Sequence, residues 1–272
     1  MTEEDGEFFE SVQRLSRDLR FTMVALSDQE ARFLVDTYYQ MQDARIRHEG
    51  QIRSMYDTRE PHSVLTWFAQ QFGTLERQLR RALDRYSFDH PDGDWLREQI
   101  GIGPVIAAGF LAHIDIQKAP TAGHIWSYAG LDPTMEWGKG QKRPYNAELK
   151  VICWKAGESF VKFHNHPDCI YGHLWRERKD LEIRKNEAGE LADQAAHQLA
   201  TKNYDRTTEA YKWYSQGKLP PAHIHARARR YAVKIFISHL HVQIYERVYR
   251  RPAPVPYPIA FLGHAHYIAP LQ

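Results

Sequence analysis

A short segment rich in glycine is the part of the chain that best suits binding of a phosphate group. Gly101 and Gly103 lack Cβ atoms, so the backbone can turn tightly and an anion can approach it. Pro104 suits the first position of a helix, where free N–H groups attract anions. We expect a helix-hairpin-helix that holds a nucleic-acid backbone without reading its sequence; a glycine-rich turn between core helices is the alternative. The residues expected to make this contact are Gly101, Ile102, Gly103 and Val105.

A basic loop at residues 134–146 is the second candidate for phosphate binding. Lys139, Lys142 and Arg143 place three cations on a segment that also contains glycine and tryptophan. Cations contact phosphates, and aromatic rings stack on bases or sugars. We therefore interpret the loop as a nucleic-acid contact, while an ordinary solvent-exposed loop explains the same residues.

The last long helical stretch offers a third basic surface. Arg227, Arg230 and Lys234 follow one another at positions i, i+3 and i+7, which lie on one face of a helix. This pattern predicts a stripe that could contact a nucleic-acid backbone. An amphipathic surface helix without a ligand shows the same pattern.

The histidines and cysteines do not predict a metal site. Two residues at i and i+2 of a helix point about 200° apart, so one His-x-His pair cannot chelate an ion from a single face. The two cysteines lack zinc-ligand spacing and fit buried apolar positions. We expect no metal and no cofactor, with Mg²⁺ needed only if the chain is catalytic. The three His-x-His pairs are His223/His225, His239/His241 and His264/His266.

Charge is distributed unevenly along the 272 residues, whose formal net charge is +2. Residues 1–60 hold 13 acidic and eight basic side chains, so the remainder carries about seven excess positive charges. A basic body with an acidic arm fits a polyanionic partner. The acidic N-terminus argues against a signal peptide, and no apolar run approaches the ~18 residues of a membrane span. We therefore expect a cytoplasmic location.

Apolar spacing indicates a mostly α fold, a helical arm or coiled coil followed by a helical body that contains the helix-hairpin-helix. In the arm, Leu75, Leu79 and Leu83 form a stripe that fits either self-association or an internal bundle. Further helices are expected from Val105 to Ala112, across residues 122–131, from Ala147 to about Phe163, across 170–216 and from His223 to about Tyr249. The expected segments are the arm (1–92), the core (93–172), a charged insertion (173–219), and a closing basic helix with a proline-rich tail (220–272).

Several motifs follow one another in a recognisable order. The GIG turn comes first, then Tyr128–Pro133 (YAGLDP), the basic loop, the helix NAELKVICWKAGESF and, near the end, Ala226–Lys234. This order resembles the C-terminal transposase domain of the DEDD, Piv-like transposases of the insertion sequence one-ten family, in which YAGLDP matches the second element, the loop and the following helix match the third and fourth in position and character, and Ala226–Lys234 resembles the closing helix. The resemblance covers residues 93–175 and 218–248, with the charged stretch between them as an insertion. The resemblance implies that DNA is a partner and that a structured guide RNA is a second partner. It also implies a bacterial or phage mobile element, whose protein would act at the nucleoid.

Two departures from the family bear on catalysis. The chain shows no RuvC-like α/β domain, whose carboxylates hold Mg²⁺ in the family, because its first part is helical without strand alternation. The family's nucleophilic serine lies in the loop before the fourth element, yet no serine occurs between Ser127 and Ser159. In that loop only Thr134 or Tyr145 could supply a hydroxyl nucleophile, which would also need activation.

These observations predict a nucleic-acid-binding protein derived from a transposase C-terminal domain, inactive as a catalyst on its own and self-associating through its N-terminal helices. One alternative is a strand-transfer recombinase with Tyr145 as its catalytic nucleophile, or with a split partner. Another is a helical scaffold for protein interactions that uses its aromatic-rich helices.

Overall fold

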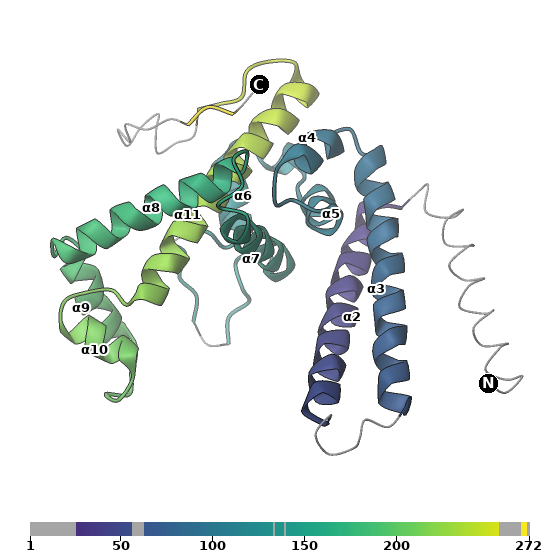
Figure 1. Ribbon diagram of the computed structural model, residues 1–272. Coiled ribbons are helices and arrows are strands. Elements are labelled where there is room, and N and C mark those ends of the chain that lie inside the picture. The colour runs from purple at the N-terminus through teal and green to yellow at the C-terminus, as the bar shows by residue number, and fades with distance from the viewer. Residues whose placement is uncertain (1–25, 56–62, 133, 139, 256–267, 271–272) are drawn as a thin grey trace, which may run out of the picture. The chain divides into compact units, whose positions relative to one another are not determined.

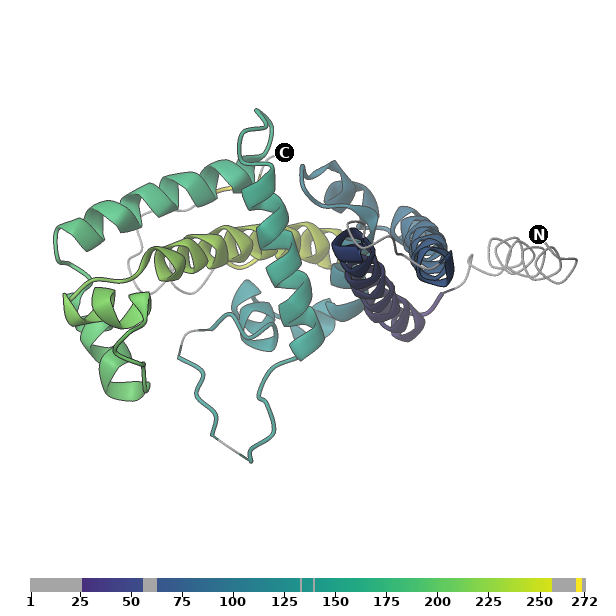
Figure 2. The same cartoon turned by 60° about the horizontal axis from the view of Figure 1, so that its bottom comes forward.

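The computed structural model describes residues 26–55, 63–132, 134–138, 140–255 and 268–270. Within these ranges the chain is helical and contains no strand (Figures 1 and 2), so the mostly α prediction is confirmed. Residues 1–25 of the predicted arm and the pair His264/His266 lie outside the described residues. Across the described ranges no helix has the length and apolar character needed to span a bilayer.

The helices follow the expected order along the chain. Their bounds are α2 (Asp28–Met55), α3 (Ser63–Asp89), α4 (Gly93–Glu98), α5 (Pro104–His113), a 3-10 turn η3 (Ile116–Lys118), α6 (Ala122–Tyr128), α7 (Ala147–Lys162), α8 (Ile170–Glu187), α9 (Ala192–Thr201), α10 (Glu209–Ser215) and α11 (Pro221–Tyr249).

The chain divides into two compact units. The first contains the described residues of Met1–Glu98 and Ile102–Asp115, and the second those of Gln99–Gly101 and Ile116–Gln272. Helices α4 and α5 therefore belong to the first unit, whereas α6 and α7 belong to the second. The helix-hairpin-helix and the coiled coil stay predictions.

The first unit is built on a hairpin of α2 and α3. A capping box starts α2, because the Ser27 N–H donates to a Glu30 carboxylate oxygen (2.8 Å) and the Glu30 N–H donates to Ser27 Oγ (3.3 Å). The hairpin buries only part of the leucine stripe, since Leu83 is fully buried while Leu75 remains 39% exposed. Inside this unit α5 packs against both long helices and is almost entirely apolar.

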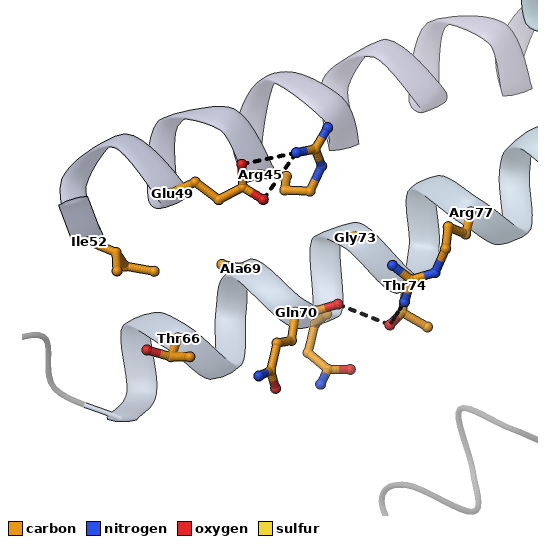
Figure 3. A pocket seen from close by; sticks show the side chains of 10 residues that line it. Arg45, Glu49, Ile52, Thr66, Ala69, Gln70, Gly73, Thr74 and Arg77 are labelled. Atoms are coloured by element: carbon orange, nitrogen blue, oxygen red, sulfur yellow. Dashed lines mark hydrogen bonds and ion pairs between the residues drawn. The ribbon is translucent and has the colours of Figure 1, made fainter.

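A pocket of about 630 Å³ lies between α2 and α3 (Figure 3). The missing side chain of Gly73 leaves space for the Arg45 side chain, because a Cβ at Gly73 would lie only 3.3 Å from Arg45 Cδ. The guanidinium of Arg45 is ion-paired with Glu76 (2.6 Å) and with Glu49 (3.0 Å). Because the central cation is neutralised by its own neighbours, we interpret this pocket as part of the hairpin's packing.

The second unit is organised around α11, which contacts α6, α7 and α8. At its centre Phe160, Tyr171 and Phe236 pack edge to face or tilted, with ring centroids 5.0–5.3 Å apart. Such aromatic pairs stabilise a core beyond the area they bury. Helix α11 also packs against α6 and α7, and the basic loop connects the end of α6 to the start of α7.

Two histidines of α11 have hydrogen-bonding partners within the fold. His239 lies between the Tyr171 hydroxyl (2.9 Å) and the Ile268 carbonyl (2.8 Å), and His241 Nε2 lies 2.9 Å from the Ala119 carbonyl oxygen. No group of three potential metal ligands occurs among the described residues. Burial lowers the pKa of both histidines, which favours the neutral imidazole.

Candidate nucleic-acid interface

Gly101 adopts a conformation that only glycine takes easily. Its φ is +97°, and a Cβ added to it would lie 3.3 Å from both Ser159 Oγ and Phe160 Cδ1. The Ser159 hydroxyl donates to the Gly101 carbonyl at 2.6 Å. The fold of the second unit therefore accounts for this glycine without a ligand, as the core-turn interpretation requires.

Gly103 is different, because nothing in the fold requires a glycine there. It is the N-cap of α5 with φ −84° and ψ 171°, it is exposed, and a Cβ would meet no atom within 4 Å. No side chain caps the helix. Ile102 and Val105 are buried, so at the helix start the backbone, and not these side chains, faces the solvent. The open backbone at Gly103 is therefore the part of this segment that an anion can reach.

The basic loop is fixed at both ends by α6 and α7. The Asn146 N–H donates to the Tyr128 carbonyl (2.8 Å), and its side-chain amide donates to the Tyr128 hydroxyl (3.0 Å). The Asn146 Oδ1 also accepts the Leu149 N–H (2.8 Å), which caps α7. The same asparagine thus ends the loop and starts the helix.

Tyr145 has a packing role at the base of the loop. A Cβ at Gly130, where φ is +63°, would lie 2.8 Å from Tyr145 Cγ, so the ring lies directly on the Gly130 backbone. The Lys150 ammonium lies 4.2 Å from the ring centroid. No described residue hydrogen-bonds the Tyr145 hydroxyl as a general base would. The geometry gives no support to the alternative in which Tyr145 is the nucleophile.

Lys142 and Arg143 lie near the tip of the loop and are exposed. Within the part of the chain that the structure describes, no carboxylate lies within ion-pair distance of either. Arg143 stacks on Trp137, with its guanidinium carbon 5.7 Å from the ring centroid. Lys139, the third predicted cation, lies outside the described residues. The loop therefore presents two unpaired cations beside an exposed indole.

Asp132 orders the other end of the loop. Its carboxylate accepts the Thr134 hydroxyl (2.7 Å), the Thr134 N–H (2.9 Å) and the Ser127 hydroxyl (3.1 Å). The pKa of Asp132 is lowered mainly by the hydrogen bonds from Thr134, and the charge of Lys234 lowers it further. Asp132 is not among the site residues predicted from the sequence, although Asp-x-Thr is a turn signal.

The predicted basic stripe on α11 is divided among different contacts. Arg227 is bound by Glu182 (2.9 Å) and also donates to Gln194, so its charge is compensated inside the protein. The Lys234 ammonium lies 5.1 Å from the Trp126 ring centroid, and burial lowers its pKa while Asp132 opposes that shift. Only Arg230 is exposed and lacks a carboxylate partner among the described residues. The structure therefore does not present these three residues as one open surface.

Residues 94–162 match a family described as the Transposase IS116/IS110/IS902 family. The matched segment runs from α4 through the glycine turn and the basic loop to the end of α7. No curated protein and no solved structure matched the chain. Residues 94–162 are therefore a segment related to the C-terminal transposase domain of this family, as the order of motifs predicted.

Proposed function

We propose that the chain binds DNA through the sugar-phosphate backbone, using the start of α5 and the basic loop as two separate contacts. The observation that carries the proposal is the open backbone at Gly103, where neither packing nor conformation calls for a glycine. Two unpaired cations on the loop support it, as does the relation of this segment to transposases. Contacts of this kind position a protein on DNA without specifying sequence. The chain would then act at the nucleoid in the cytoplasm.

A catalytic role for the chain alone is not part of this proposal. Tyr145 packs on Gly130 and lacks a hydrogen-bonded base among the described residues. Its use as a nucleophile would leave a covalent phosphotyrosine on a nicked DNA substrate, and a Tyr145→Phe variant would abolish that adduct. Structured RNA uses the same phosphate chemistry, so a mobility shift with duplex DNA and with folded RNA decides between these partners. A protein scaffold would shift neither.

Neutralising the loop should reduce the salt dependence of DNA binding. Each phosphate contact contributes about −0.9 to the slope of log affinity against log salt. We expect Lys142→Gln/Arg143→Gln to make that slope shallower by roughly 1.8, or by about 0.9 if only one residue reaches a phosphate. A mobility shift of duplex DNA between low and physiological salt measures it.

Lys162→Gln/Arg176→Gln is the matched control, because it removes two exposed cations from α7 and α8 in the same unit. This control should leave the slope unchanged. An equal change in both double variants would show that the attraction is diffuse, and the loop would lose its assignment.

We also propose that two copies associate through the arm. Phe68 and Leu75, seven residues apart on α3, are 42% and 39% exposed, and Phe33 on α2 is 71% exposed. Apolar residues at heptad spacing on a solvent-facing side of a helix suit a second helix. Phe68→Ser/Leu75→Ser should convert a dimer to a monomer in sedimentation experiments, whereas Arg77→Ser/Arg81→Ser should not. A natural chain that sediments as a monomer at all concentrations would contradict this proposal.

A further inference from the structure

A cavity of about 600 Å³ lies within the second unit, between the end of α6 and helices α9, α10 and α11. This volume is in the range of sites for small molecules. The residues assigned above to DNA binding, Gly103, Lys142 and Arg143, do not line it. The side chains that matter here are Asp132, Lys202, Tyr204, Tyr214, His223 and Arg230.

The cavity carries an excess of positive charge. Lys202 and Arg230 lack a carboxylate within ion-pair distance in the described ranges. Asp132 is the acidic residue of the lining, and its oxygens already accept hydrogen bonds from Thr134 and Ser127. An anion entering the cavity would therefore meet two cations that no carboxylate of the described ranges neutralises.

The pKa of His223, which lines the cavity, is lowered by burial and by the same positive charges. Burial, followed by the charges of Arg227, Arg230 and Lys202, lowers its pKa to about 4, although Glu182 opposes the shift. Its Nδ1 lies 3.0 Å from the Tyr214 hydroxyl. The imidazole is consequently neutral at pH 7, and a bound anion would raise its pKa again.

Aromatic rings form another part of the wall. Tyr204 and Tyr214 lie with their centroids 5.1 Å apart, and Tyr204 is only half-buried. The Tyr204 hydroxyl donates to Gln198 (3.2 Å), which holds the ring in place. A planar base can stack on such a ring whatever its identity, because every base has a π-face.

We propose that this cavity binds a nucleotide by its phosphate group, with Arg230 and Lys202 holding the phosphate and Tyr204 contacting the base. The choice of a nucleotide as ligand rests on the DNA-binding function proposed above, and the site would take one nucleotide of a strand or a free mononucleotide. Arg230 would donate more than one hydrogen bond to the phosphate, which its planar guanidinium favours.

Calorimetric titration of the full chain tests the proposal, with thymidine 5′-monophosphate, inorganic phosphate and thymidine as probes. We expect saturable binding of the monophosphate, weaker binding of phosphate and none of thymidine. Arg230→Gln/Lys202→Gln should weaken binding of the monophosphate by about tenfold or more. Arg206→Gln removes an exposed cation of the α9–α10 connection that does not line the cavity, and it should change nothing. Thymidine binding as well as its monophosphate, or equal losses in both variants, would overturn the proposal.

Histidine NMR gives a readout that a purely structural role for Arg230 would not produce. The His223 resonance, assigned by its loss in His223→Gln, should titrate at higher pH with the monophosphate than without it. An unchanged titration at saturating ligand refutes the site. Competition by single-stranded oligothymidylate identifies a strand as the source of the nucleotide, and its absence identifies a free mononucleotide.

The two proposals fail separately. If the loop variants leave duplex binding unchanged while Arg230→Gln/Lys202→Gln still loses the monophosphate, only the proposed DNA contact is wrong. If Arg230→Gln/Lys202→Gln binds the monophosphate as the natural protein does, only the cavity proposal is wrong.

Discussion

Replacing Gly103 with aspartate is expected to weaken DNA binding by tenfold to a hundredfold while leaving the fold at least as stable. An N-cap carboxylate would accept hydrogen bonds from the free N–H groups at the start of α5. Its negative charge would also repel a phosphate that approached those N–H groups. Loss of one charge-assisted contact corresponds to about 1.5–3 kcal/mol, or roughly tenfold to a hundredfold in affinity. The new side chain fits, because φ is −84° and a Cβ at Gly103 would meet nothing within 4 Å.

Gly103→Ser provides the matched control. Serine caps a helix about as well as aspartate but carries no charge, so Gly103→Ser should retain most of the DNA affinity. Mobility shifts measure affinity, and thermal unfolding of each variant shows that the fold is intact. Equal affinities for the serine and aspartate variants would mean that no phosphate approaches α5, and the turn would then be a core connection alone.

Local signals in the sequence were sufficient to place most helices. Apolar spacing predicted a helix from Ala147 to about Phe163, and α7 spans Ala147–Lys162. Two differences have local causes. The expected helix across 122–131 ends at Tyr128, because Gly130 adopts a left-handed conformation and Leu131 donates back to Trp126. The sequence also places a helix end at Ile100, before the glycine turn, and α4 ends two residues earlier, at Glu98.

The partners of charged residues could not be predicted from the sequence. Helical spacing placed Arg227, Arg230 and Lys234 on one face, but periodicity says nothing about what lies opposite that face. Glu182, which binds Arg227, is 45 residues away in the sequence. The two glycines of the turn also differ because of their tertiary neighbours. A Cβ at Gly101 would lie 3.3 Å from Ser159 Oγ in α7, whereas a Cβ at Gly103 would meet no atom within 4 Å. Tertiary neighbours therefore decide which predicted contacts remain open to a ligand.

Glu182→Ala is expected to destabilise the protein by about 3 kcal/mol, the largest loss from a single side chain that we predict. Glu182 is 1% exposed and forms ion pairs with Arg227 (2.9 Å) and Arg178 (2.6 Å). Its removal leaves two cations at a buried position without their counter-ion, although both reach partly into solvent, which keeps the cost at the lower end of the range. Urea unfolding at neutral pH measures the change in the free energy of unfolding.

The same carboxylate should make stability depend on pH. Burial raises the pKa of Glu182, but the hydrogen bonds and charges of Arg227 and Arg178 together outweigh burial and bring it below its ordinary value of 4.5. A group whose pKa is lower in the folded state stabilises the fold fully above its unfolded pKa, and the stabilisation disappears as pH falls through the folded pKa. We expect the stability deficit of Glu182→Gln to begin to shrink as pH falls below about 4.5 and to go on shrinking as pH passes through the lower pKa of the folded state. A deficit that stays constant between neutral and acidic pH would contradict the ion pair.

Replacing the Glu182–Arg227 ion pair by apolar residues tests whether Arg227 serves the fold or binds DNA. Glu182→Leu/Arg227→Met leaves no buried charge at the pair, and Arg178, which is only partly buried, can extend into water. This double variant should recover much of the stability that Glu182→Ala loses. It should also bind DNA with unchanged affinity and salt dependence, because Arg227 is compensated within the fold. A shallower salt slope for the double variant would instead place Arg227 on a phosphate, as its position on the helix face first suggested.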